Sequence, residues 1–353
     1  MTRSLLLAFS ALALFSLNAA AQNIRAGIIG LDTSHVLAFT KTLNATPQKP
    51  EVMGVRVVAA YAQGSKDIPS STQRVPEYTE KVKELGVEIV PSIDVLLDKV
   101  DVVFLETNDG RPHLEQILPC LEAHKPVFID KPIAGSLVDA IKIFDAAKKA
   151  GIPIFSSSSL RFGKSTLAVR NGSVGRVSNA ETTSPASLEE HHPDLFWYGI
   201  HGVESLFTIM GTGCQGVKRG TTADGKITVT GTWEGARTGT FTESKGYGGK
   251  AVGDKGEDAT VGKYEGYDPL LFSIVHFFRT GITPVTPEET LEIYAFMEAA
   301  EESKRRGGKS ITLREVLSKA GAPDAWLTAD PKAAPAASTK PTEKKNLPQP
   351  GSE

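Results

Sequence analysis

The chain has 353 residues, of which 40% are hydrophobic and 23% charged, so it is long enough for two domains with separate cores. A formal net charge of -2 argues against nucleic-acid binding, which needs a basic surface, and against a polybasic membrane-surface segment. Only two cysteines are present, Cys120 and Cys214, far apart in the sequence. We expect two free buried thiols rather than a disulfide.

Residues 1–21 have the composition of a secretory signal peptide. Arg3 supplies the positive start, residues 5–17 are mostly apolar, and Ala19-Ala20-Ala21 forms a small-residue cleavage pattern. The apolar run is too short for a membrane-spanning helix. We therefore expect an exported protein, periplasmic or extracellular, without a membrane partner.

Residues 22–155 alternate short β-branched runs with segments of helical periodicity. The predicted strands are residues 24–30, 55–61, 87–90, 101–105, 126–129 and 152–155, and the predicted helices are 34–43, 78–85, 93–99, 112–123 and 137–150. Strands alternating with helices form right-handed crossovers and a parallel sheet. The pattern predicts a Rossmann-type, doubly wound α/β domain that binds its ligand at the C-terminal edge of the strands.

The pattern changes in residues 156–329. A predicted helix over 193–210 precedes period-two alternation at 226–233 and 238–241, which is typical of half-exposed antiparallel strands. Two helices, 270–279 and 287–305, close this part. We predict an α+β domain with a mainly antiparallel sheet, followed by a disordered tail over 330–353, which is rich in Pro, Ala, Lys and Thr.

Four motifs follow one another along the chain: a strand over 101–108 with His113 after it, Asp130-Lys131-Pro132, Leu160-Arg161-Phe162 followed by 174–177, and a closing segment over 286–307. From about residue 24 to residue 313 their order resembles the glucose–fructose oxidoreductase, inositol dehydrogenase and MocA (Gfo/Idh/MocA) family. The resemblance implies NAD or NADP, a sugar, polyol or related substrate, and a lysine, an aspartate and a histidine that handle the proton during hydride transfer. It also implies a homo-oligomer.

The dinucleotide-binding turn departs from the family pattern. In Gly30-Leu31-Asp32-Thr33-Ser34-His35 only the first glycine of G-x-G-x-x-G remains, and Asp32 stands where a pyrophosphate would approach. Two like charges about 4 Å apart repel by roughly 4 kcal/mol at an effective dielectric near 20. Simple helix capping is the alternative. By resemblance, the cofactor-binding candidates are Gly30, Asp32, Ser34, His35, Thr107, Asn108 and His113.

A second departure follows the second strand, where the carboxylate that would hold the ribose hydroxyls is missing. Gln63, Ser65 and Lys66 stand there, either as a ribose-phosphate site or as an ordinary exposed loop. A chain exported unfolded also arrives without cofactor. We therefore expect that a dinucleotide, if used, is held tightly.

The catalytic candidates are Lys131, in the Asp-Lys-Pro motif at a strand end, and His201, at the family's helix-histidine position. The aspartate expected one turn before His201 is replaced by Trp197, so Asp194 and Glu204 are the alternative carboxylates. The rings of Trp197 and Tyr198 suit stacking on a sugar, although core packing is the commoner role of aromatic residues. The substrate candidates are Arg161, Asp194, Trp197 and Tyr198.

A charged segment, residues 189–194, leads into the same helix. His191, His192 and Asp194 are of the types that bind a transition metal, but they lack a recognised metal-binding spacing, so a solvated helix entry is the alternative. Three functions remain open. The first is an NAD(P)-dependent oxidoreductase on a sugar-like alcohol, the second a cofactor-independent or metal-dependent lyase, hydrolase or epimerase on a sugar derivative, and the third a non-catalytic carbohydrate-binding protein.

Overall fold

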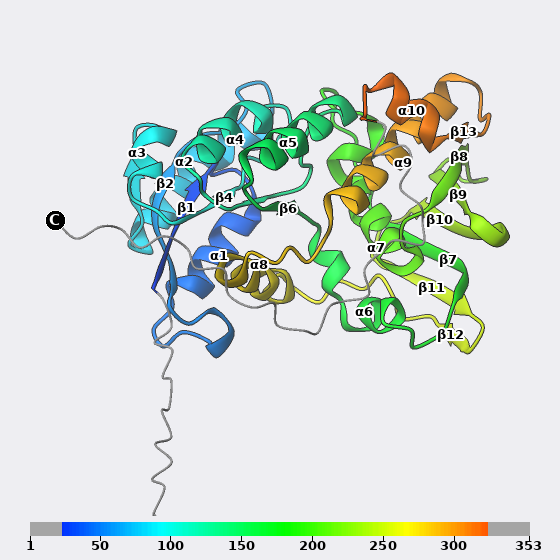
Figure 1. Cartoon of the computed structure of the whole chain (residues 1–353), viewed down its shortest axis with the longest axis horizontal. Helices are drawn as coiled ribbons and strands as arrows, with labels where there is room; N and C mark the ends of the chain where they lie inside the picture. The colour runs from blue at the N-terminus through cyan, green and yellow to red at the C-terminus, as the bar shows by residue number, and fades with distance from the viewer. Residues whose placement is uncertain (1–22, 324–353) are drawn as a thin grey trace, which may run out of the picture.

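The computed structural model describes residues 23–323, and the predicted signal peptide and the predicted tail over 330–353 lie outside them. Two β-sheets stand at opposite ends of the molecule, with α7 (Ile200–Met210) and α9 (Pro287–Arg305) between them (Figure 1). No helix of the described part is both long and apolar enough to cross a bilayer.

The first sheet has six parallel strands in the order β3-β2-β1-β4-β5-β6. This order confirms the predicted Rossmann-type domain. Strand β1 lies in the middle of the sheet, next to β4, and the central strands are buried as their apolar sequences require. The strands are β1 (Ile24–Ile29), β2 (Val55–Tyr61), β3 (Glu88–Val90), β4 (Val102–Leu105), β5 (Val127–Ile129) and β6 (Ile154–Ser156).

Five helices follow these strands: α1 (Ser34–Leu43), α2 (Pro69–Glu84), α3 (Ile93–Leu97), α4 (His113–Glu122) and α5 (Leu137–Ala150). Helix α2 begins at Pro69 rather than at the expected Tyr78. A proline suits the first helical turn, because it lacks an N–H that would have no partner there. Pro76 also lies inside α2, and the carbonyl it leaves without a donor, that of Thr72, is on the exposed surface, where water can satisfy it.

The second sheet has seven strands in the order β12-β11-β7-β10-β9-β8-β13. All of its neighbouring strands are antiparallel except β7 and β10, which confirms the predicted mainly antiparallel sheet. Helices α7 and α9 pack on one face of this sheet (Figure 1). The strands are β7 (Val177–Ser184), β8 (Cys214–Thr221), β9 (Ile227–Trp233), β10 (Arg237–Glu243), β11 (Gly248–Gly253), β12 (Gly256–Asp258) and β13 (Ile311–Thr312), and the smaller helices are α6 (Lys164–Arg170) and α10 (Leu313–Lys319).

The predicted helix over 193–210 consists of two parts. A π-helical turn, Leu195–Gly199, leads directly into α7, and such turns occur frequently at functional sites. Helix α7 is buried along its whole length, since it lies between the second sheet and the first domain.

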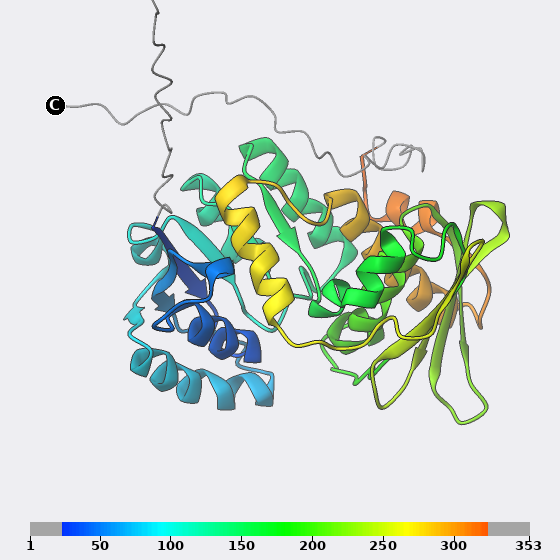
Figure 2. The same ribbon diagram turned by 90° about the horizontal axis from the view of Figure 1, so that it is seen from below.

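Helix α8 (Asp268–Thr280) comes late in the chain but packs on the first sheet (Figure 2). The ring centroid of Phe277 lies 5.0 Å from that of Phe155, and that of Phe278 lies 5.1 Å from that of Phe104. The core of the first domain therefore uses residues from beyond the expected boundary at residue 155.

Both cysteines are free and buried, as expected. Burial raises the pKa of the Cys120 thiol to about 12 and also raises that of Cys214. Both thiols are therefore protonated and unreactive at neutral pH.

Candidate functional site

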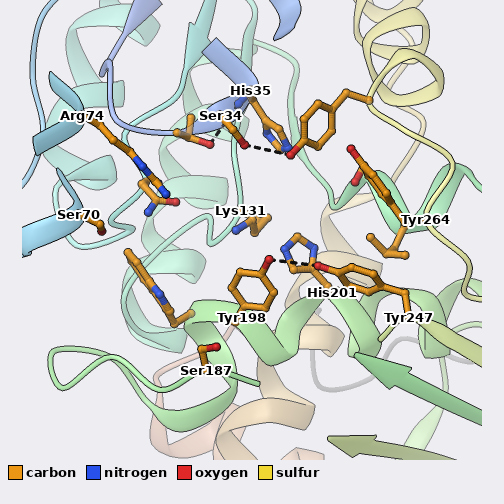
Figure 3. Close-up of a pocket in the computed structure, with 16 residues that line it drawn as sticks. Ser34, His35, Ser70, Arg74, Lys131, Ser187, Tyr198, His201, Tyr247 and Tyr264 are labelled. Atoms are coloured by element: carbon orange, nitrogen blue, oxygen red, sulfur yellow. Dashed lines mark hydrogen bonds between the residues drawn. The ribbon is translucent and has the colours of Figure 1, made fainter. Parts of the chain in front are cut away.

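A pocket of about 540 Å³ opens between the two domains, outside the C-terminal edge of the first sheet, where doubly wound folds bind their ligands. Lys131 from the first domain and His201 from the second both face it (Figure 3). Its other lining residues are Thr33, Ser34, His35, Ser70, Arg74, Asn108, Ser159, Leu160, Ser187, Trp197, Tyr198, Tyr247, Tyr264 and Tyr267.

Lys131 is the second residue after strand β5. Its backbone N–H donates to the Oδ1 of Asp130 at 2.8 Å, and its Nζ lies 5.6 Å from the ring centroid of Tyr198. The side chain is buried apart from its face to the pocket, with the whole residue 8% exposed. The backbone of Lys131 is thus fixed by Asp130, and its amino group lies over the ring of Tyr198.

His201 lies in the first turn of α7. Its Nδ1 is 2.7 Å from the Oγ of Ser158, which follows strand β6, so the hydrogen bond ties α7 to the C-terminal end of the first sheet. Burial, followed by the charge of Lys131, lowers the pKa of His201 well below its usual range. A neutral imidazole facing the pocket can accept a proton from a bound hydroxyl group.

Neither alternative carboxylate can assist His201. Asp194 pairs with Arg219 and with Lys304, and it does not line the pocket. Glu204 accepts from the Ser157 hydroxyl at 2.9 Å and pairs with a buried arginine. Trp197, at the family's aspartate position, does line the pocket.

Asp32 is turned away from the pocket. Its carboxylate accepts from the Ser71 hydroxyl at 2.6 Å and from the Asn108 N–H at 2.9 Å, and the residue is fully buried. Burial raises the pKa of Asp32 to about 6. The sequence placed the Asp32 carboxylate facing a bound pyrophosphate, and this expectation is wrong: the carboxylate points away from the pocket. Thr33 caps α1, accepting weakly from the His35 N–H at 3.5 Å.

Two other cofactor-binding candidates also lie outside the pocket. The Thr107 hydroxyl donates to Gln116 at 3.1 Å, and both ring nitrogens of His113 lie within hydrogen-bond distance of backbone carbonyls, those of Ile133 and Thr107. Both residues are fully buried. They hold the loop after β4 in place rather than face a ligand.

Arg161, expected to contact substrate, is instead part of a buried ion network. Its guanidinium pairs with Glu204 and Glu289, and Glu289 also pairs with Arg170. Arg161 is 2% exposed, so its charge is neutralised within the protein. The structure thus places Arg161 and Asp194 outside the pocket, and Trp197 and Tyr198 in it.

The sequence did not reveal two groups of lining residues. Ser70 and Arg74 reach the pocket from α2, and the Arg74 guanidinium donates to the backbone carbonyl of Asp32 at 3.1 Å. Three tyrosines come from the segment over 247–267, and Tyr267 lies 3.0 Å, hydroxyl to hydroxyl, from Ser34. The proline at the start of α2 was the available signal for Arg74, whereas nothing local marked the tyrosines.

His191 and His192 join the two domains near the pocket. His192 Nδ1 lies 3.1 Å from Glu189 Oε2, and its Nε2 lies 3.1 Å from Asp109 Oδ1. His191 likewise lies between Glu189 and Asp67. The ring of His192 also packs on Trp197, with centroids 5.0 Å apart. Asp194 lies apart from both, in its own ion pairs, so the three expected metal candidates do not form one cluster.

A parallel Rossmann sheet and a second domain built on a mainly antiparallel sheet, with a lysine–histidine pocket between them, define a two-domain fold of the Rossmann class. Residues 24–157 match the model of the GFO_IDH_MocA family, described as "Oxidoreductase family, NAD-binding Rossmann fold". Residues 24–157 are thus similar to the NAD-binding Rossmann domain of the Gfo/Idh/MocA family.

Curated relatives align with part of the chain. The myo-inositol 2-dehydrogenase of Thermotoga maritima is 31% identical over 121 residues, which is 32% of this chain and 36% of that protein. An uncharacterized oxidoreductase of Streptococcus pneumoniae is 27% identical over 150 residues, 40% of each chain. The chain thus matches well under half the length of these relatives.

Solved structures cover both domains. Scyllo-inositol dehydrogenase from Lactobacillus casei, with bound NAD(H) and scyllo-inositol, aligns with a TM-score of 0.63 at 16% identity over 83% of this chain and 99% of that one. An aldose-aldose oxidoreductase from Caulobacter crescentus, complexed with glycerol, aligns with a TM-score of 0.65 at 17% identity over 82% and 100%. At these identities the likeness establishes the shared fold.

The residues present fit the cofactor of this family over the turn between β1 and α1. Gly30 keeps a φ of +92°, and a Cβ there would lie 2.4 Å from the Thr107 nitrogen, so the turn still requires this glycine. Ser34 at the start of α1, together with Arg74 and Ser70, offers hydroxyl and guanidinium donors to a phosphate. A second hollow of about 410 Å³, which Ser65 and Lys66 help to line, lies beyond β2, where doubly wound folds of this type hold the ribose of a dinucleotide.

Proposed function

We propose that the protein is an NAD(P)-dependent oxidoreductase acting on a sugar, polyol or related alcohol. The observation that carries this proposal is the meeting of Lys131 and His201, from different domains, in one pocket above the Rossmann sheet. NAD(P), when bound, supplies the acceptor or donor of hydride. His201, neutral and held by Ser158, accepts the hydroxyl proton, and the Lys131 cation stabilises the oxygen as it becomes negative.

The aromatic wall of the pocket supports a sugar-like substrate. Trp197, Tyr198, Tyr247, Tyr264 and Tyr267 all line it. The Tyr247 hydroxyl donates to that of Tyr198 at 3.2 Å, so this wall offers apolar faces and hydroxyl groups together. Such a surface suits a ring that carries C–H groups on one face and hydroxyls at its edge.

Purified protein tests this proposal directly. Mass spectrometry of molecules released from the folded protein should detect a dinucleotide, or NAD(P)⁺ should bind when added. With a panel of polyols and aldoses, Lys131→Ala and His201→Ala should each lower kcat by roughly 10²–10⁴-fold. Lys83→Ala, on the exposed face of α2, is the matched control and should leave kcat unchanged. A folded wild type that neither retains nor binds dinucleotide would contradict the proposal.

One observation favours a second function, proton transfer without net hydride transfer, as in a lyase or epimerase. His35 stands where the G-x-G-x-x-G pattern has its third glycine, and it lines the pocket with Lys131 and His201. Three side chains able to exchange protons therefore meet there. This function predicts turnover of a sugar derivative by protein stripped of dinucleotide.

We propose that residues 1–21 direct export of the chain. Their charged start, apolar run and small-residue ending support this proposal. Cell fractionation of the full chain and of a form lacking residues 1–21 checks it: only the full chain should leave the cytoplasm.

We also propose a homo-oligomer formed through the second sheet. The outer face of β9 and β10 carries a threonine ladder, in which Thr230 and Thr240 lie 3.0 Å apart, hydroxyl to hydroxyl, and Thr228 and Thr242 lie 3.2 Å apart. A sheet face of β-branched residues of this kind suits packing against a second copy. Light scattering of the protein as it elutes from a size-exclusion column tests this proposal. A mass of two or more chains supports it, and the mass of a single chain contradicts it.

A further inference from the structure

Three side chains converge beneath the pocket from three neighbouring strands. His35 lies in the first turn of α1, just after β1, whereas Glu106 directly follows β4 and Asp130 directly follows β5. Strands β1, β4 and β5 are adjacent in the sheet and parallel, so their C-terminal ends meet at one edge. The three side chains thus come together at the ligand-binding edge of the fold.

Their donor atoms lie close enough to share one ion. His35 Nδ1 is 3.0 Å from Asp130 Oδ1 and 3.9 Å from Glu106 Oε2. One donor atom from each residue lies within 4.8 Å of the other two. Nitrogen and oxygen ligands held about 2.0–2.2 Å from one metal ion are separated by roughly 3–4.4 Å, so this spacing needs only a small adjustment.

The carboxylate oxygens of this cluster lack partners. Within residues 23–323, neither oxygen of Glu106 has a hydrogen-bond partner, nor has Oδ2 of Asp130. Glu106 and Asp130 are fully buried, and His35 is 3% exposed. Buried carboxylates are strongly unfavourable unless a cation, a proton or several hydrogen bonds compensate them. These carboxylate oxygens are therefore free to bind a positively charged group.

We propose that His35, Glu106 and Asp130 form a binding site for a divalent first-row transition-metal ion. One imidazole and two carboxylates form a mixed donor set that suits Mn²⁺ or Zn²⁺. The ion would take the place of the proton on His35 Nδ1, and Asp130 Oδ1 would keep the backbone N–H of Lys131, 2.8 Å away. The site goes beyond the proposed function, since it holds whether or not the chain transfers hydride.

A second group of this kind, Glu189, Glu190 and His191, is less suited to a metal. Its members are partly or fully exposed, and His191 already lies 2.9 Å from Glu189 and 3.4 Å from Asp67. Exposed carboxylate–histidine groups of this type need no ion to be stable. This group supplies the matched control.

The experiment is a metal titration of the full protein after treatment with a chelator. Isothermal titration calorimetry with MnCl₂ and with ZnCl₂ should show one site for at least one ion in the wild type. Glu106→Gln, which keeps the size of the side chain, should weaken binding tenfold or more, and so should His35→Gly. Glu190→Gln should bind like the wild type. Circular dichroism checks that each variant is folded.

Thermal unfolding of the wild type keeps the test decisive if Glu106→Gln does not fold. The Tm should rise with metal concentration, because an ion that binds only the folded state stabilises it by mass action. The proposal is overturned if the folded wild type binds neither ion and its Tm does not change. It is equally overturned if folded Glu106→Gln binds like the wild type, or if Glu190→Gln is the variant that loses binding. In those cases protons, rather than a metal ion, compensate the cluster.

Discussion

The carboxylate of Glu292 gives a pH dependence that one substitution can isolate. It accepts from the backbone N–H groups of Gly213 and Cys214, both at 2.6 Å, and burial raises its pKa to about 7. A carboxyl group whose pKa is higher in the folded state contributes stability below its unfolded pKa. That contribution is lost as the pH rises through the folded value.

Glu292→Gln keeps an acceptor for both N–H groups but does not ionise. We therefore expect the free energy of unfolding of Glu292→Gln, relative to the wild type, to increase by about 3 kcal/mol between pH 4 and pH 8. Urea unfolding at several pH values measures this difference. Glu77→Gln, on the exposed face of α2, is the control, and a pH-independent difference for Glu292→Gln would refute the argument.

Residues whose role depends on local sequence were predictable, whereas those with distant partners were not. The position of Lys131 follows from the end of one strand and its Asp-Lys-Pro motif. Arg161 looked equally suited to a ligand, but its partners Glu204 and Glu289 lie 43 and 128 residues away. No local pattern reveals that such a charge is already paired.

Among the helices, α7 depends on one glycine to approach the second sheet. A Cβ on Gly202 would lie 2.4 Å from a ring carbon of Phe241 and 2.9 Å from the Ser184 hydroxyl. Gly202→Ala must therefore push α7 away from β7 and β10. We expect a loss of about 1–3 kcal/mol in the free energy of unfolding.

The same substitution should lower kcat, since His201 is the neighbouring residue and would move with the helix. Gly220→Ala is the matched control: its Cβ would meet only a methyl group of Thr228, at 3.6 Å, so stability should change little. If the two substitutions have equal effects on unfolding, close packing of α7 is not the reason for the glycine.

Helices with clear terminal signals were predicted to the residue. Ser136 accepts from the Asp139 N–H and begins α5, and Gly151, with a φ of +71°, ends it. The start of α2 and the π-helical turn before α7 were missed. Pro76, inside α2, made the first part of that helix look non-helical in the sequence. In the π-helical turn, no residue type indicates the i→i+5 hydrogen bonds.

At the scale of the whole molecule, the His192 contacts bind the domains together beside the pocket. The side chain is fully buried between Glu189 and Asp109, and its neighbours Ser187 and Trp197 line the pocket. His192→Ala removes one hydrogen bond to the Glu189 carboxylate, worth about 1.5–3 kcal/mol, and the nearby Asp109 contact. We expect amide hydrogen exchange over residues 185–197 to be at least about tenfold faster.

Hydrogen-exchange mass spectrometry measures that change. The control is His276→Ala, whose side chain is exposed on α8, and exchange over 185–197 should stay at the wild-type rate. Equal rates in wild type and His192→Ala would show that other contacts hold the loop.

The sequence predicted the parallel first sheet and a mainly antiparallel second sheet, of which it located only β9 and β10, but not how the chain divides between the two sheets. The alternation of strands and helices is a local signal, whereas the position of α8 depends on packing between Phe277 and Phe155, far apart in the chain. The tyrosines of the pocket wall were missed for the same reason. Their segment, 247–267, reaches the pocket only because α8 returns to the first domain.

The packing of α8 on the first sheet constrains the order in which the chain can fold during synthesis. The apolar face of the first sheet needs Leu270, Ile274 and Phe277 to exclude water, so it stays open until the segment up to Val285 has been synthesised. Domains normally fold as units in the order in which they leave the ribosome. Here the first domain cannot complete its core until the second half of the chain has been synthesised. If residues 1–21 direct export, the chain would therefore stay unfolded, and able to pass through a narrow translocation channel, until late in translation.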